Sequence, residues 1–280
     1  MCLLCFFVAY LIIDMMVTPF RLAASSYLNS APLIWSFLNG AKRGQVDFVE
    51  AVPARCADLL SQSEVEGALI PVIEYQRIAG GALVPDVCVG SQKEVLSVVL
   101  VSKDTELEQI RSVALDESSR TSATLVKVIF REFLDHEPVW TTRSPHLEEM
   151  LERNDAALII GDPGMTFPRT GLKVWDMANV WRTFTGLGFV FAMWMIADRG
   201  VERARRVDFA GARDEGVAHI EDIVAEYKDK IPMPVQELRK YLTENIVFRV
   251  DDSMRKGLQL YYELAAKHGL IETVKPLRFV

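Results

Sequence analysis

The sequence is poor in the residues that most often carry nucleophilic catalysis. Its 280 residues include only four histidines. All four fall in segments that we predict to be helix surfaces or helix ends: His136, His146, His219 and His268. A serine or cysteine nucleophile needs a histidine base beside it, so the pattern does not favour nucleophilic hydrolysis. The motifs G-x-S-x-G and H-E-x-x-H and the phosphate-binding P-loop do not occur either.

Cysteines are equally few, which bears on metal binding. Cys2 and Cys5 form a C-x-x-C pair in an apolar tail, whereas Cys56 and Cys88 lie far apart. Since no second pair and no nearby histidine completes a set of four ligands, we predict no metal site. The glycine fingerprint of a dinucleotide site is missing too, and we expect no cofactor. Reduced thiols are the expected state, which favours a cytoplasmic location.

The chain also lacks any run of basic residues. Its formal net charge is −7, so nucleic acid is not an expected partner. Residues 1–13 carry no charge, but they are too short to span a bilayer and lack the basic start of a signal peptide. We therefore expect no membrane partner and interpret residues 1–16 as an extension from a start site assigned too early, with translation beginning at Met15 or Met16. A secretion signal is the alternative.

Strands and helices alternate through the first third of the chain. We predict strands at 20–26, 46–52 and 67–72, and helices at 33–38 and from Pro53 onward. Polar residues collect where these strands end, and the candidates are Asn29, Glu74 and Tyr75. Ligands of open α/β sheets bind at the carboxyl ends of the strands. The alternatives are a solvated acid for Glu74 and a half-buried aromatic residue for Tyr75.

The remaining elements continue this alternation and then become helical. Further strands are predicted at 84–90, 95–102, 112–115, 138–141, 156–160 and 189–197. Helices are predicted at 105–110, 123–134, 146–153, 234–245 and 253–267, and at 201–227 with a break near Gly211 or Gly216. Residues 175–181 are predicted to be a loop or a short helix.

A hydroxyl-rich turn joins the predicted strand at 112–115 to the helix at 123–134. Its candidate residues are Ser118, Ser119, Arg120, Thr121 and Ser122. Free backbone N–H groups and the positive end of the helix dipole point out of such a turn. Together with the arginine, they suit a carboxylate or a phosphate. The alternative is that Ser118 or Ser119 only caps the helix.

A second polar strand end lies at residues 161–164, where Gly-Asp-Pro-Gly follows the strand at 156–160. The pattern is a strong turn signal. It places Asp162 at the carboxyl end of a strand, as the hydroxyl-rich turn also is. Asp162 is therefore a candidate ligand contact, and an Asx turn before Pro163 is the alternative.

The strand–helix units fall into two sets, which predicts an α/β fold with two lobes. We assign residues 17–97 and 190–280 to the first lobe and 98–189 to the second, with crossing strands near Val98 and Phe189. A chain that leaves one lobe, builds another and returns leaves a cleft that can close on a small ligand. On residue types alone, the sequence indicates a two-lobed protein with a cleft for a small anion.

Five stretches of the sequence resemble one known family. They are residues 26–32 (Ser-Tyr-Leu-Asn-Ser-Ala-Pro), 69–75, 115–122, 157–162 and 185–192. On these stretches the chain resembles the MqnA family, the chorismate dehydratases of the futalosine route to menaquinone. One departure is Gly188, where the family pattern has proline. Residues 1–16 have no counterpart, in keeping with a start site assigned too early.

The resemblance implies a type II periplasmic-binding-protein fold, in which two α/β lobes are joined by two crossover strands. It also implies that chorismate loses water to give 3-[(1-carboxyvinyl)oxy]benzoate, without metal or cofactor. Asn29 and Ser97 are the expected catalytic residues, hydrogen-bonded near the reacting carbon and the leaving hydroxyl. The expected substrate-binding residues are Tyr27, Glu74, Tyr75, Ser118, Ser119, Arg120, Thr121, Ser122 and Asp162.

Several alternatives stay open at this point. The proton-abstracting base is the substrate's own enolpyruvyl carboxylate, or else Glu74 or Asp162. Ser97 is either catalytic or a small residue packed at a hinge strand. The sister family MqnD has the same fold and acts on a futalosine-derived substrate, and a transporter's solute-binding protein has it without any catalytic residue.

Overall fold

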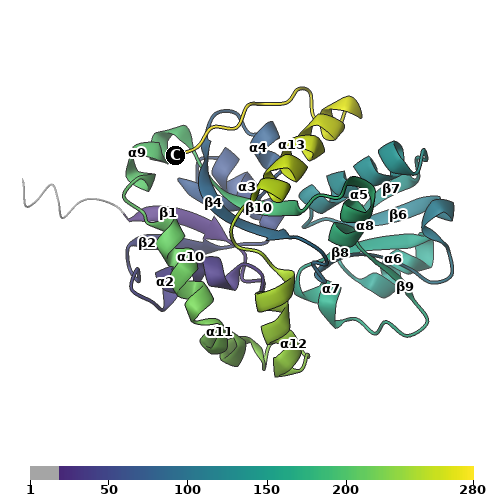
Figure 1. Ribbon diagram of the computed structural model, residues 1–280, viewed down its shortest axis with the longest axis horizontal. Helices are drawn as coiled ribbons and strands as arrows, with labels where there is room; N and C mark the ends of the chain where they lie inside the picture. The colour runs from purple at the N-terminus through teal and green to yellow at the C-terminus, as the bar shows by residue number, and fades with distance from the viewer. Residues whose placement is uncertain (1–18) are drawn as a thin grey trace, which may run out of the picture.

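The strands form two separate five-stranded sheets, one in each lobe (Figure 1). The computed structural model describes residues 19–280. Residues 1–16, and with them the start-site prediction, lie outside this range. None of the helices in the described range has the length and apolar character needed to cross a membrane.

Lobe 1 is built on a mixed sheet with the strand order β2-β1-β3-β10-β4. Its strands are β1 (Phe20–Ala24), β2 (Val46–Glu50), β3 (Gly67–Pro71), β4 (Ala82–Ser91) and β10 (Phe189–Ile196). β1 runs parallel to β2 and β3, whereas β10 runs antiparallel to β3 and β4. The segments between the first four strands hold α2 (Ala31–Leu38), α3 (Pro53–Ser61) and α4 (Glu74–Arg77).

Lobe 2 repeats this plan with the strand order β7-β6-β8-β5-β9. Its strands are β5 (Val98–Ser102), β6 (Ser112–Asp116), β7 (Val139–Arg143), β8 (Ala156–Ile160) and β9 (Lys173–Asp176). β6 runs parallel to β7 and β8, and β5 runs antiparallel to β8 and β9. The helices are α5 (Thr121–Phe133), α6 (Leu147–Arg153), α7 (Asp162–Thr166) and α8 (Met177–Thr185).

The burial of the strands explains why the sheets lie inside the lobes. Every residue of β3, β5 and β8 is buried, as expected for strands that read as continuous apolar runs and are covered on both faces. Helix α5 is amphipathic instead, since Leu125 and Ile129 are buried while Lys127 and Arg131 are partly exposed. The 3.6-residue period of the sequence therefore predicts its inner face correctly.

The chain passes between the sheets twice, through links at residues 92–97 and 186–188. Val98 pairs with Ile160 in lobe 2, and Phe189 pairs with Ser91 in lobe 1. The two crossings are thus short links that directly precede Val98 and Phe189, the positions near which the sequence predicts them. The exact lobe borders at 97/98 and 189/190 stay a prediction.

The last third of the chain is helical, as predicted, but is divided differently. Its elements are a 3₁₀ turn η2 (Asp198–Gly200), α9 (Val201–Ala204), α10 (Phe209–Ala218), α11 (Ile220–Tyr227), α12 (Val235–Lys240), a π-helical turn η3 (Tyr241–Asn245) and α13 (Asp252–Lys267). The helix predicted at 201–227 is broken at residues 205–208 and at His219, close to Gly211 and Gly216, although both glycines lie inside α10. A Cβ atom at Gly216 would overlap the carbonyl oxygen of Pro32, so this glycine lets α10 pack closely on α2.

Two further predictions about the elements need correction. Residues 175–181 contain the end of an edge strand, β9, and the start of α8. The Asp176 side chain caps α8 by accepting hydrogen bonds from Ala178 N and Asn179 N. Aspartate is a preferred residue at this helix position, but our prediction did not include the cap. The helix predicted at 105–110 shortens to a 3₁₀ turn, η1 (Leu107–Gln109).

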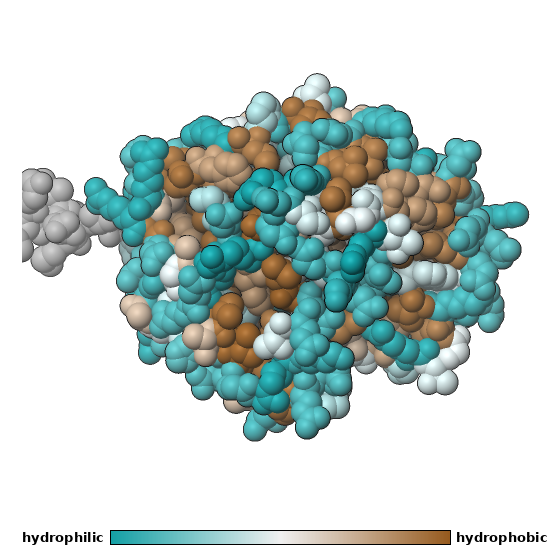
Figure 2. All heavy atoms as spheres, viewed as in Figure 1, coloured by the Kyte–Doolittle hydropathy of each residue, from teal (hydrophilic) through white to brown (hydrophobic). Residues whose placement is uncertain are grey.

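The C-terminal residues return to lobe 1. Phe279 forms a β-bridge with Leu83 at the edge strand β4, and the C terminus lies beside α9 (Figure 1). On the face drawn in Figure 2, hydrophilic residues cover most of the surface and apolar residues show between them in separate patches. Among the described residues, large apolar side chains with substantial exposure include Val139 at 66% and Phe279 at 47%.

Candidate functional site

A pocket lies between the two lobes, at the carboxyl ends of strands from both sheets. Its lining includes residues of β3, β4 and β10 from lobe 1 and of β5 and β8 from lobe 2, and small-molecule sites often lie at such an interface between domains. The polar residues that line it are Ser25, Tyr27, Asn29, Ser30, Ser118, Ser119, Arg120, Thr121 and Ser122. The structure thus brings together seven of the residues predicted from the sequence, which come from two stretches far apart in the chain.

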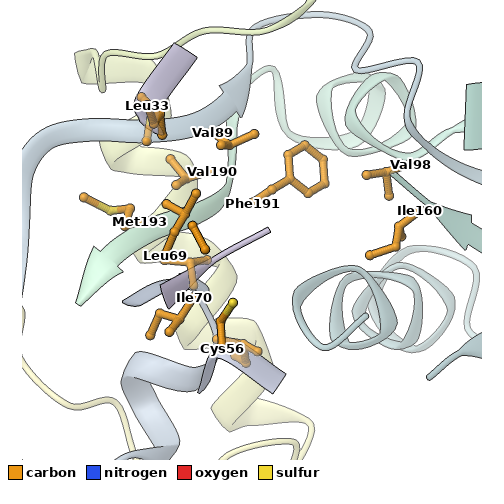
Figure 3. Close-up of a cluster of buried hydrophobic side chains, with 14 of the residues drawn as sticks. Leu33, Cys56, Leu69, Ile70, Val89, Val98, Ile160, Val190, Phe191 and Met193 are labelled. Atoms are coloured by element: carbon orange, nitrogen blue, oxygen red, sulfur yellow. The ribbon is translucent and has the colours of Figure 1, made fainter. Parts of the chain in front are cut away.

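An apolar wall of the pocket comes from both lobes. Val89 and Phe191 belong to strands of lobe 1, and Val98 and Ile160 to strands of lobe 2. In Figure 3 the Phe191 ring points away from β10 toward Val98 and Ile160. A ligand in this pocket would meet hydroxyl and amide groups as well as hydrocarbon. Such a wall suits a ring.

The hydroxyl-rich turn begins α5 without any side-chain cap. Arg120 is the N-cap residue, and no side chain bonds to the free N–H groups of the first turn. The alternative that Ser118 or Ser119 only caps the helix is therefore wrong. Thr121 and Ser122, the first two residues of α5, both line the pocket. Their backbone N–H groups have no partner inside the helix.

Ser118 is fixed by a buried carboxylate. Its backbone N and its Oγ donate to Oδ1 of Asp116, over 2.9 and 2.6 Å, and Ile160 N donates to Oδ2 of the same residue. Burial raises the pKa of Asp116, while the bonds from Ser118 oppose that shift. These bonds fix the Ser118 side chain at the pocket, whose lining also includes Tyr27.

Ser119 differs from its neighbour because its hydroxyl has no protein partner. Its Oγ is buried and makes no hydrogen bond, while the residue lines the pocket. A buried hydroxyl without a partner costs about 1–3 kcal/mol. A buried hydroxyl group normally has a hydrogen-bond partner, and a ligand in the pocket would provide one for Ser119.

Arg120 also lines the pocket, but its charge is already balanced. Nη1 lies 2.8 Å from Glu74 Oε2 and Nη2 lies 2.6 Å from Asp58 Oδ1. Glu74 pairs with Arg77 as well, at 2.7 Å. The fork that would grip a substrate carboxylate is therefore occupied by two protein carboxylates. Arg120 thus links α3, α4 and the start of α5, and its predicted role in binding an anion stays a prediction.

Glu74 and Tyr75 are not among the residues that line the pocket. They form the first turn of α4 and are both buried. The Tyr75 hydroxyl donates to Pro276 O over 2.8 Å and accepts from Arg278 N over 2.9 Å. The structure thus places both side chains toward Arg120 and the C-terminal segment, and their predicted role in substrate binding stays a prediction.

The two expected catalytic residues have different positions. Asn29 lines the pocket, whereas Ser97 does not and is 0% exposed. The Ser97 hydroxyl accepts a hydrogen bond of 2.7 Å from Tyr241. The alternative prediction, a small residue packed at a hinge, describes the surroundings of Ser97 better. No local pattern in the sequence points to Tyr241, because it lies 144 positions from its partner Ser97.

Asp162 does not line this pocket but borders a neighbouring cleft that also includes Tyr227 and Lys230. Its Oδ1 accepts a hydrogen bond of 3.0 Å from Leu28 N, so it joins the two lobes. The Asp162 side chain therefore does not form the Asx turn that was the alternative prediction. Burial raises the pKa of Asp162 to about 6. Among residues 19–280, no cluster of three or more His, Cys, Asp or Glu could hold a metal ion.

Solved structures confirm the class of fold. A crystallised protein from Archaeoglobus fulgidus is 20% identical to this chain, with a TM-score of 0.72 over 90% of this chain and 98% of that one. A Candida albicans protein described as having the generic periplasmic binding protein fold is 13% identical, with a TM-score of 0.62 over 92% of each chain. The two lobes and the pocket between them thus define a protein of the periplasmic-binding-protein-like class.

Sequence comparison then identifies the family. A family model described as menaquinone biosynthesis matches residues 20–267, so the chain belongs to the menaquinone biosynthesis family. A relative from Thermus thermophilus named chorismate dehydratase is 28% identical over 265 residues, which cover 88% of this chain and 94% of the relative. The family resemblance stated from the sequence is confirmed.

Proposed function

We propose that this protein is a chorismate dehydratase, a carbon–oxygen lyase. The observation that carries the proposal is the pair of unsatisfied donors in the pocket, Ser119 Oγ and the backbone N–H groups that begin α5. Such donors bind a carboxylate well, because the positive end of the helix dipole adds to their hydrogen bonds. Chorismate carries two carboxylates, and the named relative supports this choice of substrate.

The proposed reaction removes a proton and a hydroxyl group from chorismate as water. The product is 3-[(1-carboxyvinyl)oxy]benzoate, whose ring is aromatic, so the elimination is strongly downhill. No electron is gained or lost, and the proposal includes no cofactor. The protein then needs only to orient the substrate and to stabilise the charge that develops.

In this proposal the substrate ring lies against the apolar wall. Phe191 and Ile160 would face the ring, and one carboxylate would lie at Ser119 and the first N–H groups of α5. The Asn29 amide would then donate to the reacting side of the substrate, near the leaving hydroxyl. Ser97 would act from behind Asn29, since its hydroxyl is fully buried.

The protein groups near the pocket favour the substrate itself as the base. Within the described chain, Arg120 is the one charged residue that lines the pocket. Glu74 is held by two arginines, and Asp162 is bonded to Leu28 N at the neighbouring cleft. We therefore propose that the enolpyruvyl carboxylate of chorismate takes the proton. A cytoplasmic location is part of the same proposal and is supported by the biosynthetic family.

The test is to mix the purified protein with chorismate and to follow the aromatic product by chromatography. We expect product well above the spontaneous rate, and Asn29→Ala should lower kcat by about 10²–10³, the effect typical of a lost transition-state donor. Wild-type protein that binds chorismate without converting it would support a solute-binding protein instead. A protein that neither binds nor converts it would direct attention to the futalosine-derived substrates of the sister family.

A further inference from the structure

Two serines in the lining of the pocket are hydrogen-bonded to each other across the turn that carries Asn29. Ser25 follows β1 and Ser30 precedes α2, and their Oγ atoms lie 2.9 Å apart. The two residues are 5% and 3% exposed, and both line the pocket. The pair therefore joins the end of β1 to the start of α2, with Asn29 between them.

The Ser30 hydroxyl is bound to Asn29 and does not cap α2. Ser30 is the N-cap residue of this helix, where a serine hydroxyl usually accepts from a backbone N–H of the first turn, but its side chain makes no such bond. Its Oγ instead donates to Asn29 Oδ1 over 3.2 Å. The backbone holds the two residues in place, since Ser30 N donates to Tyr27 O over 2.9 Å and Ala31 N donates to Leu28 O over 3.2 Å.

The bonds of this chain run in one direction. A serine hydroxyl has a single proton. Because Ser30 gives its proton to Asn29, the donor in the contact between the two serines is Ser25. Asn29 lines the pocket, and the carbonyl oxygen of its amide is bound by the protein. The hydrogens on Nδ2 are then what the amide offers to an oxygen atom of a ligand.

A donor of fixed orientation suits the elimination proposed above. The departing hydroxyl of chorismate gains negative charge as its C–O bond breaks, and a donor already aimed at that oxygen stabilises the charge without reorganisation. An amide turned the other way round would present its carbonyl oxygen and repel the leaving group. Because the two ends of an amide are nearly identical in size, hydrogen bonds to the protein decide which end faces the pocket.

We propose that Ser25 and Ser30 are positioning residues, which bind the carbonyl end of the Asn29 amide so that its Nδ2 donates to the substrate. The kinetic part of the proposal rests on the proposed dehydratase function, whereas the orientation of the amide does not depend on any substrate. Neither serine needs to contact the substrate. Ser25 acts on Ser30 and Ser30 acts on Asn29, and each of these steps can be tested by itself.

The kinetic test removes the two hydroxyl groups one at a time. Ser30→Ala should lower kcat for chorismate about 3- to 10-fold, the equivalent of one hydrogen bond, with KM within about twofold of wild type. In an Asn29→Ala background the same change should alter kcat by less than about twofold, because residues that act as a unit are not additive. Ser25→Ala should lower kcat about 2- to 5-fold and have no further effect once residue 30 is alanine.

Two kinetic outcomes would overturn the proposal. Losses that are the same in every background, or that are confined to KM, would show that the serines contact the substrate directly. Wild-type kcat in both single variants would show that the Asn29 amide keeps its orientation without them.

A matched control on α2 separates positioning from simple loss of a buried hydroxyl. Ser36 is 0% exposed, and its Oγ donates to Glu215 Oε2 away from the pocket lining. Ser36→Ala should lower the melting temperature about as much as Ser30→Ala while kcat stays at the wild-type value. A similar fall of kcat in both variants would mean that general destabilisation is the cause and would refute the positioning role.

A readout without substrate tests the orientation itself. The chain has five asparagines, so ¹⁵N-asparagine labelling gives five side-chain amide signals, and Asn29→Ala identifies the one from Asn29. The Ser25 hydroxyl bonds to Ser30 and not to Asn29, so a shift of the Asn29 signal in Ser25→Ala would report the chain of bonds. Ser36→Ala should leave this signal in place.

An Asn29 signal that moves in neither Ser25→Ala nor Ser30→Ala would contradict the proposal. If wild-type protein makes no product from chorismate, the proposed function fails, and this experiment still decides the role of the two serines.

Discussion

Arg120 and Glu74 form an ion pair of 2.8 Å in which the Glu74 side chain is only 6% exposed. The pair lies directly behind the turn that begins α5. Asp58 from α3 binds the other terminal nitrogen at 2.6 Å, so three helices meet at one guanidinium. The positive charge that the sequence offers to an anion is paired with two protein carboxylates, and in our proposal the pocket binds its ligand through helix N–H groups and hydroxyl groups.

The first prediction concerns the stability of this ion pair. Arg120→Gln should lower the free energy of unfolding by about 1–3 kcal/mol, because it leaves the buried Glu74 with only Arg77. The double variant Arg120→Gln with Glu74→Gln should lose less than the sum of the single losses, since no uncompensated buried charge remains. Urea unfolding of the four proteins measures this coupling. Purely additive losses would contradict the pairing.

The second prediction contrasts the two adjacent serines. Ser119→Ala should leave the free energy of unfolding unchanged or raise it by up to about 1 kcal/mol, because it removes a buried hydroxyl without a partner. The same change should raise KM for chorismate about tenfold, the loss of one hydrogen bond to a charged group. Ser118→Ala should instead cost about 1–3 kcal/mol, since Asp116 loses a donor. Equal behaviour of the two variants would argue against a ligand at Ser119.

The third prediction concerns the contact of Gly161 with Tyr27. Gly161 has φ +68°, and a Cβ atom there would lie 2.7 Å from the Tyr27 ring. Gly161→Ala should abolish most turnover, because Tyr27 must move at the pocket. Gly171 has φ +75° and open space around it, so Gly171→Ala should have a similar backbone cost of about 1–3 kcal/mol with normal turnover. If Gly161→Ala kept its turnover, the position of Tyr27 would be unimportant.

The fourth prediction concerns pH and Asp162. Burial raises the pKa of this carboxyl to about 6, above its value of about 4 in the unfolded chain. Between these values the folded state binds more protons, so this group's contribution to stability falls as pH rises from about 4 to about 6. The loss amounts to about 2–3 kcal/mol. Asp162→Asn should lack this step in denaturant unfolding at pH 4, 5, 6 and 7, and an unchanged pH profile would contradict it.

The sequence predicts the pocket best where a local pattern decides the structure. An apolar strand, a hydroxyl-rich segment and an amphipathic helix follow one another at residues 112–133, and together they place Ser119, Thr121 and Ser122 at the carboxyl end of β6. Strand ends gather at one edge of a parallel sheet whatever the remaining contacts are. For that reason the position of Asn29 could be predicted as well, whereas Tyr27 is named only by the family resemblance.

The sequence fails where the direction of a side chain depends on distant residues. Glu74 and Tyr75 follow β3 closely, yet their partners are Arg120 and the segment at Pro276. No local pattern carries this information, because α4 is a single turn that can direct its side chains to either side. Tyr241 was missed for the same reason, since its partner Ser97 lies in another third of the chain.

The strand order of lobe 1 has a consequence for synthesis on the ribosome. Lobe 2 has all its strands once Asp176 has emerged, but β10 must still be made before it can enter between β3 and β4. Until then these two strands expose unpaired edges, which is when a nascent chain is most prone to aggregate. Asn29 is translated early, whereas Phe191 of β10 follows all the strands of lobe 2, so the pocket lining is completed only after lobe 2 has been made.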